Sequence, residues 1–162
     1  MYKLTYSPAS HYVRKVRLAG YLSGLKDQIE LLNDTSGKLY PNDDNKKIIL
    51  TNAALTEGLV DASLLYVYSI RYAGDQKPSE VWQKLQLSKI ENTIDYLDKN
   101  VSNDFNPSKV YISHIGLIVA LDYLNFRKIY DWEMKTKNLD TWHKQVSASM
   151  PGYKETYPKD PS

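Results

Sequence analysis

The residues best placed for chemistry lie in the opening stretch "MYKLTYSPASHYVRKVRLAG". Ser7 and Ser10 flank Pro8 where an alternating apolar pattern gives way to a helical one, so a hydroxyl lies near the start of a helix. Taken alone, Ser10 is most simply a helix N-cap, worth about 1 kcal/mol of stability. The residue types by themselves leave capping and catalysis both open.

The other chemical candidates give weaker signals. His11, His114 and His143 fall on three different predicted elements, with no i, i+4 pair and no acidic cluster, so we expect no metal site. The sequence has no cysteine, which excludes disulfides and cysteine nucleophiles and fits a reducing compartment. Three tyrosines gather near the end of one long predicted helix, where core or interface packing is their simplest role: Tyr66, Tyr68 and Tyr72.

Two arginines on the first predicted helix carry the strongest local charge. Arg14 and Arg17 could neutralise a ligand carboxylate. We expect instead that one of them pairs with Asp61 or Glu57 on the long helix, tying the N-terminal segment to the rest of the protein.

The elements that must position these residues begin with a predicted strand, helix and strand. Tyr2, Leu4 and Tyr6 alternate with polar residues, as in a strand with one buried face. A helical period follows Ser10 and stops at Gly24, and "DQIELLN" then predicts a second strand. A crossover of this length makes the two strands parallel.

Everything after the polar connection "TSGKLYPNDDN" has a helical period. Ser79 is the expected N-cap of the second of four long helices. The third is apolar almost all round between Ile115 and Leu121, as in a central buried helix. At its start, Tyr111 and His114 do not match a capping box, so Ser108 or Ser113 could cap a shifted start. We therefore predict an α+β fold that is predominantly α, with long helices at about 45–72, 79–100, 110–126 and 138–150.

Length and charge narrow the class of protein. The chain has 162 residues, enough for one domain or one domain with a small appendage, and a formal charge of only +2, so nucleic acid is a poor candidate partner. The longest apolar run is too short to span a bilayer, and the N-terminus does not read as a signal sequence. We expect a soluble cytoplasmic protein with no membrane partner.

Several separate stretches resemble one family in the right order. "YSPASHYVRKVRLAGYLSGLKDQIELL" is similar to the opening of a bacterial glutathione S-transferase. The family's all-helical C-terminal domain is resembled by "ALTEGLVDASLLYVYSIRY", "VWQKLQLSKIENTIDYLDK", "HIGLIVALDYLNFR" and "DWEMKTKNLDTWHKQVSASMPGYKETYP". The resemblance implies a partial thioredoxin-like segment at 1–34, a linker at 35–44 and an all-α domain at 45–162.

The resemblance also implies a function and its residues. Such proteins hold the glutathione thiolate with a hydroxyl near the start of the first helix, which makes Ser10 the expected catalytic residue and Ser7 the second candidate. It implies glutathione contacts from Ser7, Ser10, His11 and Tyr12, and an apolar electrophile against Tyr66, Tyr68 and Tyr72. Glutathione is then a co-substrate, no cofactor is needed, and a homodimer is expected.

One departure from the family pattern keeps three functions open. "IELLN" passes almost directly into the linker, so the cis-proline loop and the acid-Ser pair that hold glutathione in the family have no counterpart, as after an internal deletion. The chain is then an enzyme acting through Ser10, a non-catalytic relative that binds a ligand or partner, or a deleted product with no independent role.

Overall fold

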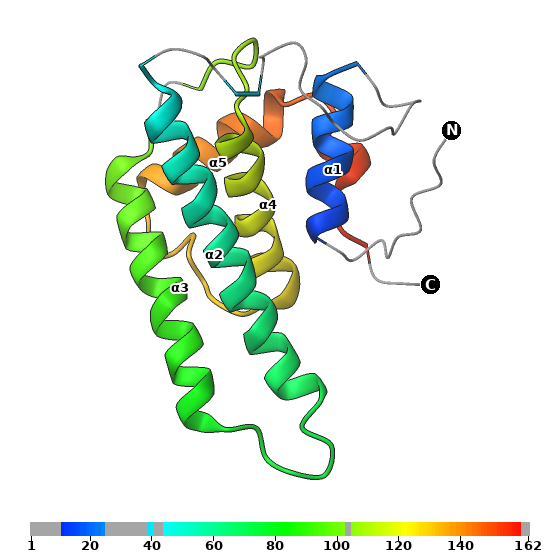
Figure 1. Cartoon of the computed structure of the whole chain (residues 1–162), viewed down its shortest axis with the longest axis vertical. Helices are drawn as coiled ribbons and strands as arrows, with labels where there is room; N and C mark the ends of the chain where they lie inside the picture. Colours follow the sequence, from blue (N-terminus) through cyan, green and yellow to red (C-terminus); the bar gives the residue numbers. More distant parts are fainter. Residues whose placement is uncertain (1–10, 25–38, 41–43, 103–104, 160–162) are drawn as a thin grey trace.

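A computed structural model describes residues 11–24, 39–40, 44–102 and 105–159, and these residues are helical apart from the connections (Figure 1). The helices are α1 (His11–Leu22), α2 (Lys46–Arg71), α3 (Glu80–Asn100), α4 (Ile112–Arg127), α5 (Asn138–Ser149) and the single turn α6 (Tyr153–Thr156). Helices α2, α3 and α4 pack side by side, while α1 lies along one side of α4 with α6 behind it.

The predicted α+β class is wrong for this chain, because the described residues contain helices and no strand. The two predicted strands, at 2–6 and 27–33, lie outside the described residues. The class rested on alternation over two very short segments, and two strands alone are marginal as a sheet. The division into segments 1–34, 35–44 and 45–162 stays a prediction.

The long helices after the linker are confirmed, and each begins and ends within about two residues of its predicted position. Local sequence explains these boundaries. Ser79 caps α3 as predicted, its hydroxyl accepting from the Trp82 N–H at 3.3 Å. The expectation that His114 has no capping role is wrong: its Nδ1 accepts from the Tyr111 N–H at 3.2 Å, because an imidazole nitrogen can replace a carboxylate there.

Helix α4 is the centre of the core, as its uniformly apolar sequence predicts. It is buried from Ile115 to Leu124 without interruption. Helix α2 approaches it closely at Gly116, where a Cβ would lie 2.2 Å from the Thr56 hydroxyl oxygen. Each fully buried Leu or Ile contributes roughly 1.5–3 kcal/mol, and the buried set on the packed helices includes Leu18, Leu59, Ile90, Ile94, Leu121, Leu139 and Val146.

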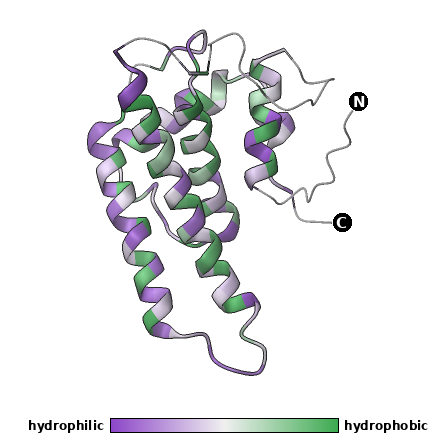
Figure 2. Ribbon diagram, viewed as in Figure 1, coloured by the Kyte–Doolittle hydropathy of each residue, from purple (hydrophilic) through white to green (hydrophobic). Residues whose placement is uncertain are grey.

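Helices α2 and α3 form a hairpin that projects beyond the rest of the bundle (Figure 1). Hydrophobic colour continues toward its tip in Figure 2, and several large apolar side chains there are exposed: Ile70, Tyr72, Val81, Trp82 and Leu85. By length and composition alone α2 is also a candidate membrane span. In the structure one side of α2 packs on α3 and α4, as in the core helix of a bundle.

Candidate functional site

The first turn of α1 presents a buried histidine with no hydrogen-bond partner. His11 is 4% exposed, and its ring centroid lies 4.1 Å from that of Tyr12 and 4.3 Å from that of Tyr123. Neither ring nitrogen has a partner among the residues that the structure describes. Burial lowers the pKa of His11 from 6.5 to about 4, so the ring is neutral and offers one donor and one acceptor. Buried polar groups are normally hydrogen-bonded, so the ring carries donor and acceptor capacity that no described residue uses.

Tyr12 fixes the same turn against α2. Its hydroxyl donates to Asp61 Oδ1 at 2.5 Å. Burial, together with that hydrogen bond, raises the pKa of Tyr12 far above its usual value, so the phenol stays protonated. The Tyr12 hydroxyl therefore donates its proton to the hydrogen bond with Asp61, and this bond holds α1 against α2.

Positive charge faces this turn from the C-terminal ends of two helices. The Arg127 guanidinium lies 5.8 Å from the centroid of Tyr123. Burial raises the pKa of Tyr123, while Arg127 and Arg71 act in the opposite direction. The Asp61 carboxylate lies beside the same turn, so the local charge is mixed.

Two of the three predicted pocket tyrosines lie together on α2, and the third does not join them. The rings of Tyr68 and Tyr72 meet edge to face with centroids 5.1 Å apart, and both side chains are exposed. Tyr66 is half-buried and lies two residues away, about 200° around the helix, so it faces another direction.

A buried ion pair fixes α1 on the bundle. Arg14 and Asp122 are 3% and 1% exposed, and Arg14 Nη1 donates to Asp122 Oδ2. Asp122 Oδ1 also contacts His143 Nε2 at 2.6 Å and accepts from the Tyr153 hydroxyl at 3.2 Å. The Arg14 guanidinium lies 4.9 Å from the ring centroid of Tyr153 and 5.1 Å from that of Tyr157, so aromatic faces complete its surroundings.

This pairing corrects the prediction that Arg14 or Arg17 binds Asp61 or Glu57. Lys15 Nζ forms an ion pair with Glu57 Oε2, and Arg17 Nη2 donates to the Glu155 carbonyl oxygen at 2.8 Å. The missed signal was Asp122 itself, the one acidic residue in the apolar α4, which requires a buried cation.

Ser7 and Ser10 lie outside the described residues, so their expected roles stay predictions. Among the residues of the described ranges, no group of three or more His, Asp or Glu side chains could hold a metal ion. The geometry thus brings together His11, Tyr12 and Tyr123, with Arg127 beside Tyr123.

Solved structures share the fold of this chain. A glutathione transferase family member from Pseudomonas fluorescens Pf-5, with bound S-(propanoic acid)-glutathione, matches with a TM-score of 0.80 at 25% identity over 96% of this chain and 98% of its own. The chain has a glutathione transferase-like fold. A glutathione S-transferase from Methylobacillus flagellatus KT, with glutathione bound, matches at a TM-score of 0.78 and 20% identity over 95% of this chain and 98% of its own.

The same fold extends beyond bacteria. A delta-class glutathione transferase from Nilaparvata lugens matches at a TM-score of 0.70 and 18% identity, over 93% of this chain and 90% of its own. No family model and no curated protein matches the sequence. The glutathione transferase-like fold therefore rests on the arrangement of helices, as the resemblance in the helical segments predicted.

Proposed function

We propose that this protein binds glutathione at the N-terminal end of α1 and conjugates it to, or removes it from, small electrophiles. In the forward direction the thiol loses its proton to solvent, a sulfur-carbon bond forms, and the bond to the leaving group breaks. The observation that carries the proposal is the likeness to the Pseudomonas fluorescens protein, which holds a glutathione conjugate on this fold.

The local chemistry supports an anionic sulfur at this position. The N-terminal end of a helix favours negative charge, and Arg71 and Arg127 add positive charge near Tyr123. Ser10 immediately precedes His11 in the sequence. In this proposal the Ser10 hydroxyl donates to the thiolate, with Ser7 as the second candidate, while the unpartnered His11 ring and Tyr12 border the bound tripeptide.

The electrophile side of the site is proposed on α2. The exposed pair of Tyr68 and Tyr72 offers aromatic faces for an apolar molecule. Tyr66, the third predicted residue, faces elsewhere and contributes least. The exposed tyrosines suit a small apolar electrophile next to the sulfur.

The departure of the sequence after "IELLN" from the family pattern favours an alternative function. We propose that an internal deletion has removed the backbone and acidic groups that hold glutathione in the family, so affinity is weaker than in an intact relative. Orientation contributes more than a single hydroxyl donor. If glutathione binding is lost entirely, the chain is a non-catalytic glutathione transferase-like binding or scaffold protein.

We also propose a cytoplasmic homodimer with a detoxifying role. The absence of cysteine fits a reducing compartment. The exposed apolar side chains on the projecting hairpin of α2 and α3 offer a surface for a second copy. Light scattering at high concentration tests this directly, since a strict monomer would remove the homodimer from the proposal.

Turnover of glutathione with a generic aryl halide tests the catalytic proposal. Ser10→Ala should reduce the rate roughly 10- to 1,000-fold, the loss of one donor to a developing anion. The same change should cost only about 1 kcal/mol of stability, the value of a helix cap. Ser7→Ala is the matched control and should change the rate less. Activity indifferent to Ser10→Ala would remove Ser10 from the site, and absence of any turnover would favour the non-catalytic alternative.

A further inference from the structure

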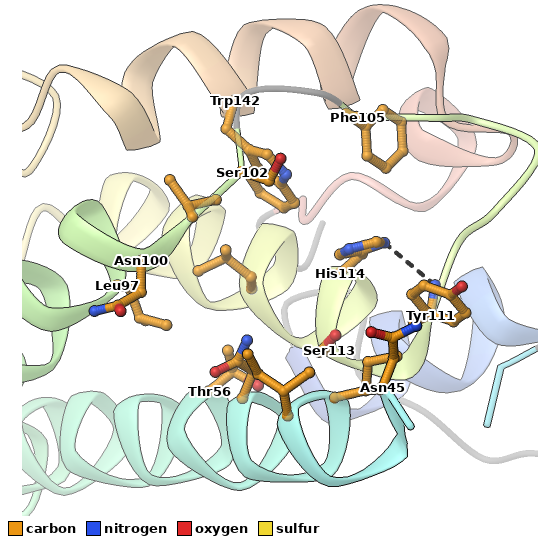
Figure 3. A pocket seen from close by; sticks show the side chains of 15 residues that line it. Asn45, Thr56, Leu97, Asn100, Ser102, Phe105, Tyr111, Ser113, His114 and Trp142 are labelled. Atoms are coloured by element: carbon orange, nitrogen blue, oxygen red, sulfur yellow. Dashed lines mark hydrogen bonds between the residues drawn. The ribbon is translucent and has the colours of Figure 1, made fainter. Parts of the chain in front are cut away.

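A cavity of about 250 Å³ lies at the opposite end of the bundle from the first turn of α1. It opens between the N-terminal ends of α2 and α4 and the C-terminal end of α3, with Trp142 of α5 closing one side (Figure 3). His114 in its wall and Tyr123 beside His11 are nine residues apart on α4, about 13 Å along the helix. The cavity is therefore separate from the proposed glutathione site.

Aromatic rings form one side of this cavity. The ring centroid of His114 lies 5.6 Å from that of Phe105, 5.4 Å from that of Tyr111 and 6.2 Å from that of Trp142. Figure 3 shows these side chains around one space, with aliphatic side chains completing the wall: Ile48, Ile49, Leu97, Val101 and Leu117. Such walls suit a flat aromatic molecule.

None of the described residues that line the cavity is charged. Its fifteen lining residues include no Asp, Glu, Lys or Arg, although a quarter of the sequence (25%) is charged. The polar members of the wall, such as Asn45, Asn52 and Asn100, are neutral amides or hydroxyls. Among these described residues a charged ligand finds no counterion, which favours an uncharged molecule over glutathione.

His114 supplies one directed hydrogen-bond donor. Its Nδ1 accepts from the Tyr111 N–H, so in the neutral ring the proton is on Nε2. Burial lowers the pKa of His114 from 6.5 to about 4, which keeps the ring neutral. No hydrogen bond from a described residue engages Nε2, and Figure 3 shows the ring among the lining side chains. Nε2–H is thus available to an oxygen acceptor inside the cavity.

We propose that this cavity is a second ligand site, which binds an uncharged aromatic molecule carrying a carbonyl-type oxygen. The aromatic ring packs against Trp142 and Phe105, and the oxygen accepts from His114 Nε2–H. The volume of about 250 Å³ equals that of about eight liquid waters at about 30 Å³ each, which is room for a molecule with a single ring.

Acetophenone is the probe that tests this proposal on the whole chain. We expect saturable binding with a Kd of about 0.1–1 mM, usual for so few atoms. In two-dimensional NMR spectra the Trp142 indole N–H signal, assigned with Trp142→Phe, should shift, while the signals of Trp82 and Trp132 stay in place. No shift of the Trp142 signal up to the solubility limit would overturn the proposal.

Two ligands similar in shape to acetophenone test separately the hydrogen bond to the oxygen and the preference for an uncharged molecule, with no mutation needed. Isopropylbenzene lacks the oxygen and should bind roughly fivefold more weakly, the value of one hydrogen bond. Benzoate adds a charge and should bind at least about tenfold more weakly. Equal binding of isopropylbenzene would exclude the role of Nε2–H, and equal binding of benzoate would exclude the selection for neutral ligands.

Variants provide the matched test. Leu117→Trp should fill the cavity and abolish acetophenone binding, and His114→Phe should weaken acetophenone roughly fivefold without weakening isopropylbenzene. Neither residue belongs to the proposed thiol-transfer site, so glutathione turnover is a separate readout that both variants should retain. Acetophenone binding of wild-type strength in a folded Leu117→Trp variant, or in His114→Phe, would place the ligand elsewhere and overturn the proposal.

Discussion

Asp122→Asn is the change that most sharply tests how α1 is held on the bundle. Asp122 contacts Arg14, His143 and Tyr153 in an almost fully buried position. The amide keeps the shape of the carboxylate but removes its charge, so the Arg14 cation is left buried without a counterion. Removing one partner of a buried pair costs about 3–5 kcal/mol, and we expect the free energy of unfolding to fall by that amount.

Urea unfolding followed by far-ultraviolet circular dichroism measures this loss. The midpoint should fall while the slope stays the same, because the folded state is destabilised and not expanded. Glu57→Gln is the matched control: it removes the Lys15 pair, whose carboxylate is 43% exposed, and should cost less than about 1 kcal/mol.

A double variant completes the test. Arg14→Met combined with Asp122→Asn removes the stranded cation, so the pair should be more stable than Asp122→Asn alone. Two results would refute the reasoning: an Asp122→Asn cost no larger than that of Glu57→Gln, or a double variant in which the two losses simply add.

Three further predictions concern the histidines, the helix contact and the cap. His11 and His114 have pKa values lowered from 6.5 to about 4 in the folded state, so the unfolded state binds protons first as the pH falls. The free energy of unfolding should therefore decrease as pH drops from about 6.5 to 4. Urea midpoints that stay constant across this range would contradict the prediction. Gly116→Ala places a Cβ 2.2 Å from the Thr56 hydroxyl oxygen and should lower the free energy of unfolding by about 1–3 kcal/mol, measured by thermal unfolding. Adding Thr56→Ala in the same chain should recover part of this stability. An unchanged midpoint for Gly116→Ala would argue against the close contact. Ser79→Ala should cost about 1 kcal/mol in urea, and Ser88→Ala, within α3, should cost less.

The long helices could be predicted from the sequence because their signals are local and repeated. Helix α4 carries an apolar run that only a buried position explains, and Ser79 caps α3 by contacting a backbone group three residues away. The α+β class failed because alternation over a few residues is a weak signal, which needs neighbouring strands to support it.

The site depended on contacts that no local pattern encodes. Arg14 and Asp122 are 108 residues apart, so no local pattern pairs them, and the predicted partners on α2, Asp61 and Glu57, were wrong. His114 was judged by residue type alone, although its ring nitrogen both caps α4 and borders the cavity. The position of His11 between two tyrosines likewise appears only when α4 packs on α1.

Titration of the wild-type protein with glutathione, followed by two-dimensional NMR, tests the central claim most directly. The proposed site predicts saturable binding at millimolar concentration or tighter, with the largest shifts at His11, Tyr12 and Tyr123 and none at Trp142. Silence of these signals at about ten times that concentration, or shifts centred on Trp142 instead, would contradict glutathione binding at the N-terminal end of α1.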